Sequence, residues 1–274
     1  MKNKNVLLAV SFGTSNHETR AATIGAIEDA LQAAYPDYEV RRAFTSQIII
    51  DKLRRRDDIH TDNVTTAMSK LAAEGVKRVV VQPTHVMSGI EYDEMLDCVK
   101  PYEHRFESVS YGSPLLTSDK DFIRVAELIT KELPRNASRL SESGENSGST
   151  AYVFMGHGTE HSANSVYARL QNTLNAGGRS DCYIGTVEAV PSLDDVIKLV
   201  DASGVKRVVL LPLMIVAGDH ACNDMAGDAN GSWKTVFGKK GYEVECVLKG
   251  LGEYQGIREI FVEHAGEAIR EDKR

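Results

Sequence analysis

The amino-acid sequence predicts an α/β fold of two similar domains, each with a four-stranded parallel sheet flanked by helices, and an active-site cleft between them. Three observations predict it: apolar runs alternate with amphipathic stretches, a segment of the chain repeats, and a polar stretch separates the copies. The chain has 274 residues, 42% of them hydrophobic. That length allows one large core or two cores of about 100 to 150 residues each.

Strands and helices are expected to alternate along the chain. The apolar run VLLAVSF at 6–12 is followed by a helical pattern from Glu18 to Ala34, and YEVRRAF at 38–44 is followed by further helix. This alternation is typical of parallel strands joined by helical crossovers.

An internal repeat relates the two halves of the chain. GVKRVVVQP at 75–83 recurs as GVKRVVLLP at 204–212, and a glycine follows each copy, Gly89 and Gly218. FGT at 12–14 likewise matches HGT at 157–159, each between an apolar strand and a helix. The repeat predicts two copies of one βα unit, and clefts between such domains commonly bind small ligands.

The domain boundaries follow from composition. The stretch from Pro134 to Thr150 is rich in Ser, Gly, Asn and charge, which is typical of a linker. We therefore expect an N-terminal α/β domain over residues 1–135 and a C-terminal α/β domain over 149–252 that carries the metal site. Residues 253–274 form a helical pattern that is expected to pack back on the N-terminal domain. Its apolar stripe comprises Ile257, Ile260, Phe261, His264 and Ile269.

Charge and composition exclude several classes of function. The formal net charge is -7 and the pI is about 5.7, which argues against a nucleic-acid partner. The sequence has no apolar run of about 18 residues and no secretory signal pattern, so we expect a cytoplasmic protein without a membrane partner. The four cysteines lack CxxC spacing and indicate neither a disulfide framework nor a thiolate zinc site. The ligand is expected to be small, and the sequence leaves a homo-oligomer open.

Three polar residues follow strands of the second half, where ligands bind in open parallel sheets: His157, Glu188 and His220. Two imidazoles and one carboxylate suit a divalent ion such as Co, Ni, Fe or Zn. Each residue alone has another interpretation: His157 as a turn residue, Glu188 as a capping or ion-paired acid, and His220 as a buried histidine. Their common sheet edge favours a metal site.

The repeat places one further acid at the predicted cleft. At a constant offset between the GVKRVV copies, Glu91 falls opposite His220, whereas Phe12 takes the place of His157. The metal is therefore expected in the second half, with Glu91 facing it. The alternative for Glu91 is an acid in the first turn of the helix EYDEMLDCV, where the helix dipole favours negative charge.

Loops of the first half supply the candidate substrate contacts. The loop PTHVMSG contains His85 and Met87, which either line an adaptable hydrophobic slot or pack in the core. The turn FGTS resembles a phosphate-cradling turn, although one glycine is too few to establish one. The complete set of predicted substrate-binding residues is Ser11, Phe12, Gly13, Thr14, His85, Met87, Ser88 and Gly89.

The sequence resembles the anaerobic sirohydrochlorin cobaltochelatases of the class II chelatase superfamily over nearly its whole length. The motifs that carry the resemblance are SFGTS, IEYDEM with its preceding loop, MGHGTEH, GTVE and GDHACNDMAGD. The resemblance implies a two-domain, chelatase-like fold and a cobalt ion held by His157, Glu188 and His220. It also implies that His157 serves as proton acceptor.

The implied reaction inserts Co²⁺ into the tetrapyrrole sirohydrochlorin and releases two protons, early in anaerobic cobalamin biosynthesis. We expect His157 and Glu91 to be the catalytic residues, with Glu91 as a proton relay. Cobalt is then the substrate metal, sirohydrochlorin or a related carboxylated tetrapyrrole is the partner, and no organic cofactor is expected. Arg41 and Arg42 are candidates for binding the carboxylates of this implied substrate. The alternatives are a sirohydrochlorin ferro- or nickel-chelatase, a non-catalytic metal-binding chaperone and a metallohydrolase.

Overall fold

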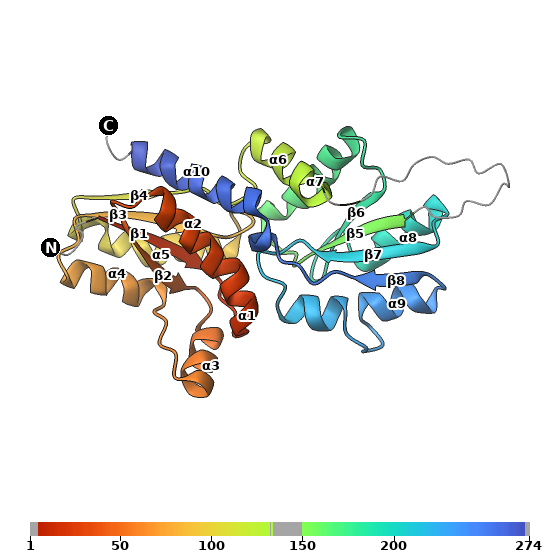
Figure 1. Ribbon diagram of the computed structural model, residues 1–274, viewed down its shortest axis with the longest axis horizontal. Helices are drawn as coiled ribbons and strands as arrows, with labels where there is room; N and C mark the ends of the chain where they lie inside the picture. Colours follow the sequence, from red (N-terminus) through yellow and green to blue (C-terminus); the bar gives the residue numbers. More distant parts are fainter. Residues whose placement is uncertain (1–4, 132, 134–149, 272–274) are drawn as a thin grey trace. The chain divides into compact units, whose positions relative to one another are not determined.

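A computed structural model describes residues 5–131, 133 and 150–271 of the chain (Figure 1). It divides into two compact units. The first contains the residues up to Thr117 together with those from Gly252 onward, and the second runs from Ser118 to Leu251. The predicted linker, Pro134 to Thr150, lies outside the described residues except for Thr150, which begins a strand.

The first unit is built on a parallel sheet with the strand order β2-β1-β3-β4. The strands are β1 (Asn5–Ser11), β2 (Glu39–Phe44), β3 (Arg78–Pro83) and β4 (Ser108–Tyr111). Strands β1 and β3 are buried over almost their whole length, as expected for central strands covered on both faces by helices.

Helices of the first unit connect these strands and cover the sheet. They are α1 (His17–Arg20), the π-helix η1 (Ala21–Gly25), α2 (Ala26–Ala34), α3 (Gln47–Asp57), α4 (Val64–Ala73), α5 (Ile90–Val99), the 3-10 helix η2 (Lys100–Arg105) and α10 (Gln255–Glu271). Asn16, Ser46 and Asn63 cap α1, α3 and α4 by accepting a hydrogen bond from a backbone N–H of the first turn.

Helix α10, drawn in blue, runs alongside α2 in the first unit (Figure 1). The Tyr35 hydroxyl donates a hydrogen bond to the Val262 carbonyl at 2.7 Å. The His264 ring is held 3.0 Å from the Ser113 carbonyl. All five residues of the predicted apolar stripe are buried, so the last helix is part of the first unit's core.

The second unit has the equivalent parallel sheet, with the strand order β6-β5-β7-β8. Its strands are β5 (Thr150–Gly156), β6 (Cys182–Thr186), β7 (Arg207–Pro212) and β8 (Glu243–Cys246). Its helices are α6 (Asp119–Thr130), the 3-10 helix η3 (Ser162–Asn164), α7 (Ser165–Ala176), α8 (Leu193–Ser203), the π-helix η4 (Ala221–Met225) and α9 (Trp233–Lys239). The short 3-10 helix η5 (Leu251–Glu253) stands where the units join along the chain.

Sheet register confirms the internal repeat. Asn5 pairs with Arg78 in the first unit, and Thr150 pairs with Arg207 in the second. Because β1 and β5 have the same length, as do β3 and β7, every residue of one pair has a counterpart in the other. The prediction of two similar four-stranded parallel sheets is therefore confirmed.

One domain boundary differs from the sequence-based one. Residues 1–135 were expected in the N-terminal domain, but α6 belongs to the second unit. The Arg169 guanidinium of α7 lies 4.1 Å from the centre of the Phe122 ring of α6, and it also forms an ion pair with Asp119. Arg179 donates a hydrogen bond to the Thr130 carbonyl at 3.0 Å, so both ends of α6 are tied to the second unit.

The helices of the described ranges include none that is long and apolar enough to cross a membrane. All four cysteines carry free thiols, Cys222 exposed and Cys182 buried.

Candidate metal centre

Three strands of the second unit deliver the three predicted ligands to one place. His157 follows the last residue of β5, Glu188 lies two residues beyond β6, and His220 stands at the start of the helix after β7. One ligand atom from each residue can be chosen so that all three lie within 4.8 Å of one another. The structure thus brings together the three side chains that the sequence singled out.

The spacing of these side chains fits a shared cation. His157 Nε2 lies 3.7 Å from Glu188 Oε1, which is too far for a hydrogen bond. The His157 and His220 rings meet edge to face, with centroids 4.7 Å apart and an interplanar angle of 70°. Ligand atoms about 2.1 Å from a common ion stand roughly 3 to 4 Å apart, so the observed separations need little adjustment.

Hydrogen bonds orient both imidazoles. His157 Nδ1 lies 3.0 Å from the Gly158 carbonyl, and His220 Nδ1 lies 2.7 Å from Asp224 Oδ2. A carbonyl or carboxylate only accepts, so in the neutral form of each imidazole Nδ1 carries the hydrogen and Nε2 keeps a free lone pair. Both histidines are therefore set to bind a metal through Nε2.

Asp224 is a functional candidate that the sequence analysis missed. It stands four residues after His220, within η4, the π-helix that follows this histidine directly. Single π-helical turns occur often at functional sites. The available signal was the four-residue spacing in GDHACND, which puts the carboxylate on the same side of a helix as the imidazole.

The turn after β5 is fixed by its backbone. Gly158 has φ +88, and a Cβ at this position would lie 2.8 Å from the Ala189 nitrogen. The His157 carbonyl accepts hydrogen bonds from the Val187 and Glu188 amides at 3.1 and 2.9 Å. The loop that carries Glu188 therefore lies directly against the turn that carries His157, and only glycine fits between them.

Two of the alternatives for the three ligands do not hold, namely Glu188 as a helix cap and His220 as a buried histidine. Helix α8 is capped by Ser192, whose side chain and that of Asp195 form a capping box, so Glu188 is not a cap. The side chains of His157, Glu188 and His220 are 41%, 56% and 39% exposed. All three are thus accessible to a ligand.

Glu91 lies in the first turn of α5, two residues after the N-cap Gly89. The Asp93 amide donates to the Gly89 carbonyl, as the Cys222 amide does to the Gly218 carbonyl, so the offset that relates Glu91 to His220 persists into both helices. The position also fits the dipole interpretation of Glu91, and the two interpretations are compatible.

The loop between β3 and α5 contains the buried imidazole of His85. Both ring nitrogens are shielded from solvent, and neither has a hydrogen-bond partner among the described residues. Burial lowers the pKa of His85 to about 4, against a smaller opposing effect of Glu91. Met87 is partly buried and Ser88 is exposed.

The turn after β1 presents mixed surfaces. Ser11 and Thr14 are buried, whereas Phe12 is 51% exposed. Gly13 has φ +100, and a Cβ there would lie 2.6 Å from the Phe44 ring. The Thr14 carbonyl accepts a hydrogen bond from the buried Arg20, and nothing in the turn marks a phosphate site.

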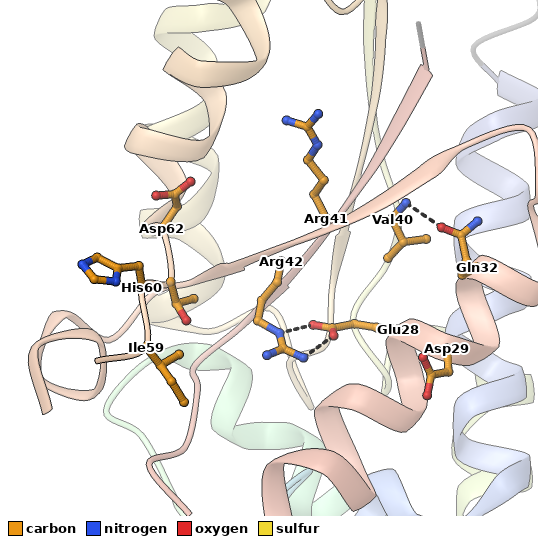
Figure 2. Close-up of a pocket in the computed structure, with 10 residues that line it drawn as sticks. Glu28, Asp29, Gln32, Val40, Arg41, Arg42, Ile59, His60 and Asp62 are labelled. Atoms are coloured by element: carbon orange, nitrogen blue, oxygen red, sulfur yellow. Dashed lines mark hydrogen bonds and ion pairs between the residues drawn. The ribbon is translucent and has the colours of Figure 1, made fainter. Parts of the chain in front are cut away.

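A cavity of about 460 Å³ lies in the first unit at the outer edge of β2 (Figure 2). Arg42 pairs with Glu28 across it, and Arg41 bonds Glu39 and Glu74. Both guanidinium groups are thus already neutralised by glutamates, which gives no support to them as carboxylate anchors. Two backbone amides of the edge strand β2 are bonded outside the sheet. The Val40 amide donates to Gln32 Oε1, and the Phe44 amide donates to the Asp62 carbonyl.

Comparison with known proteins shows the family to which this chain belongs. The family model for cobalt chelatase (CbiK) matches residues 4–270. The chain belongs to the CbiK cobalt chelatase family. It is 41% identical to a sirohydrochlorin cobaltochelatase of Salmonella typhimurium over 266 residues, which is 97% of both chains. It is 34% identical to the sirohydrochlorin cobaltochelatase CbiKC of Nitratidesulfovibrio vulgaris over 273 residues, which is 98% of this chain and 92% of that protein.

Solved structures share the fold of this CbiK family member. The structure of SirB from Bacillus subtilis with Fe³⁺ superposes with a TM-score of 0.66 at 12% identity, covering 98% of both chains. A sirohydrochlorin chelatase SirB from Bacillus subtilis subspecies spizizenii in complex with cobalt has a TM-score of 0.60 at 11% identity, covering 98% of this chain and 97% of that one. At these identities the likeness concerns the fold.

Proposed function

We propose that this protein is a sirohydrochlorin cobaltochelatase, which inserts Co²⁺ into sirohydrochlorin and releases two protons. The observation that carries the proposal is the convergence of His157, Glu188 and His220 within 4.8 Å at the carboxyl ends of the strands. Two imidazoles and one carboxylate suit cobalt, and the family membership favours a chelatase over a metal chaperone or a metallohydrolase.

Three protein ligands serve delivery better than storage. Two Nε2 lone pairs and one carboxylate leave coordination positions open, into which the pyrrole nitrogens of the substrate can enter. A closed set of four or more ligands would hold the ion too firmly for transfer. Release is favoured because the macrocycle offers the metal more nitrogen ligands than the protein does.

Proton removal is the second task of the site. The two pyrrole protons are weakly acidic until the cation approaches, so a base close to the metal is needed. We assign this role to His157, because an imidazole accepts protons near neutral pH and Glu188 lies 3.7 Å away to stabilise the resulting cation. Glu91 is proposed as a relay that passes the protons on.

The test is insertion of the metal by the purified protein. Sirohydrochlorin and Co²⁺ are mixed with the wild-type chain, with His157→Ala and with His220→Ala, and the visible spectrum is followed. We expect the wild type to insert the metal rapidly and both variants to insert it at close to the uncatalysed rate. The melting temperatures of both variants should be near that of the wild type. Parallel runs with Fe²⁺ and Ni²⁺ establish metal preference. Tight Co²⁺ binding without insertion would instead support a chaperone.

A further inference from the structure

Val190 is an exposed apolar residue in a loop that follows a strand. Among the described residues, seven large hydrophobic side chains are exposed, and three of them lie in such loops: Phe12 after β1, Val190 after β6 and Leu248 after β8. The other four lie within helices: Ile48 in α3, Ile90 in α5, Ile123 in α6 and Leu199 in α8. Single exposed apolar residues are ordinary, but Val190 is the most exposed of the three loop residues, at 69%, and it shares its loop with Glu188.

The backbone around Val190 is held firmly. The Val190 carbonyl accepts a hydrogen bond from Asn164 Nδ2 at 2.7 Å. The next carbonyl, that of Pro191, accepts hydrogen bonds from the Thr186 amide at 2.7 Å and from the Thr186 hydroxyl at 3.1 Å. The Ala189 amide donates to the same hydroxyl at 3.2 Å. The loop therefore holds an apolar side chain in solvent instead of letting it fold back on the core.

We propose that Val190 is a substrate-positioning residue whose side chain packs against the apolar face of the tetrapyrrole. Val190 lies on the same loop as Glu188, two residues further along the chain, so a macrocycle that approaches the metal ligands meets it. A tetrapyrrole has a flat, largely apolar ring and carboxylates at its rim, and packing on the ring requires an apolar surface that is already fixed in place. The inference rests on the proposed function, since it names a further contact for that substrate.

The test separates substrate affinity from metal affinity. Val190→Asn keeps a similar size but replaces the apolar surface, and it is expected to weaken sirohydrochlorin binding about tenfold through lost apolar burial. Co²⁺ affinity, measured by calorimetry, should be unchanged because the three ligands remain. Val190→Ile should bind sirohydrochlorin as the wild type does. Leu199→Asn replaces another exposed aliphatic side chain, on α8, and is the matched control, which should change neither affinity.

Binding of the substrate can be followed through Trp233, the single tryptophan of the chain, which is buried in the second unit. Its fluorescence should be quenched by energy transfer to a bound tetrapyrrole. The inference is wrong if Val190→Asn binds sirohydrochlorin as tightly as the wild type does. It is also wrong if the variant loses as much affinity for Co²⁺ as for sirohydrochlorin, because the substitution would then have displaced the loop. If the wild type inserts Co²⁺ and Val190→Asn binds sirohydrochlorin as the wild type does, the inference about Val190 fails and the proposed function holds. If the wild type neither binds sirohydrochlorin nor inserts the metal, both proposals fail.

Discussion

The two histidines of the centre differ in the group that fixes their tautomer. His157 Nδ1 faces a backbone carbonyl, whereas His220 Nδ1 faces the Asp224 carboxylate at 2.7 Å. A carboxylate partner makes an imidazole a stronger electron donor than a carbonyl partner does. His220 is thus suited to retain the ion. His157 is suited to release the ion and then to accept a proton on Nε2.

Asp224→Asn tests this division. An asparagine can donate its amide hydrogen to Nδ1 and so favour the tautomer with the hydrogen on Nε2, which cannot bind metal. We expect Co²⁺ affinity to fall about 10- to 100-fold, the usual cost of losing such a partner. Calorimetric titration of Co²⁺ measures it, with Asp228→Asn as a control because Asp228 pairs with Lys234 instead. An unchanged affinity would show that Asp224 does not orient His220.

The two glutamates are expected to have separate tasks. Glu188→Gln should weaken Co²⁺ binding to the free protein, because an amide oxygen is a poorer ligand than a carboxylate. Glu91→Gln should leave this affinity nearly unchanged and slow insertion. Calorimetry and a turnover assay on each variant distinguish the effects. Equal loss of metal affinity in both variants would contradict the assignment of the ion to the second half alone.

His85 is expected to make stability depend on pH. Burial lowers the pKa of His85 to about 4 in the folded protein, whereas an unfolded histidine titrates near 6.5. Between these values the unfolded chain binds a proton that the folded protein does not, so stability falls as pH is lowered from about 6.5 to 4. The shift corresponds to a loss on the order of 3 kcal/mol at the acid end. In His85→Leu this contribution is absent, so urea titrations should show a shallower decline, and parallel curves would contradict the interpretation.

At the scale of elements, the proposed metal centre depends on how closely the turn after β5 approaches the loop after β6. Gly158→Ala adds a Cβ at φ +88 that would lie 2.8 Å from the Ala189 nitrogen. We expect a loss of roughly 1 to 3 kcal/mol from the backbone conformation, a further loss from the clash, and weaker Co²⁺ binding as Glu188 moves. Gly178→Ala is the control, since Gly178 has φ +76 but nothing within 4 Å of an added Cβ. It should lose stability without losing metal affinity.

Much of this arrangement was predictable from the sequence because it depends on strand ends. The GVKRVV repeat fixed the equivalence of β3 and β7, and polar residues after buried strands can reach the same sheet edge in any parallel fold. The apolar stripe of α10 has helical period and identified a core helix. These predictions needed only local pattern and one rule of topology.

Other features depend on tertiary contacts that no local pattern encodes. Helix α6 precedes the polar stretch, so composition assigned it to the first domain, whereas the stacking of Arg169 on Phe122 joins it to the second unit. The π-helical turn η4 carries no recognised sequence signature, whereas the pairing of Asp224 with His220 is local and was indicated by their four-residue spacing. The exposure of Val190 results from hydrogen bonds between loops distant in sequence.

At the scale of the whole molecule, the two repeats share a sheet architecture but differ in their proposed roles. The sheets are equivalent in order and register, yet Phe12 of the first unit stands where His157 stands in the second. All three proposed ligands, and the carboxylate that orients one of them, belong to the second unit. The first unit instead incorporates the C-terminal helix α10, which adds the buried side chains of Ile257, Ile260 and Phe261 to its core.

This division predicts that stability and metal binding can be separated. Phe261 is fully buried in the first unit, so Phe261→Ala should cost about 3 to 5 kcal/mol of unfolding free energy through the cavity it leaves. Well below the melting temperature, its Co²⁺ affinity should equal that of wild type, because all three proposed ligands lie in the second unit. Phe237→Ala is the counterpart in the second unit: Phe237 is equally buried and packs in one cluster with Ala221 and Met225 of η4. It should lose a similar amount of stability and also bind Co²⁺ more weakly, since η4 carries Asp224 and follows His220 directly.

Urea titrations followed by circular dichroism give the stabilities, and calorimetry gives the affinities. Equal loss of Co²⁺ affinity in both variants would show that the centre depends on the first unit as much as on the second.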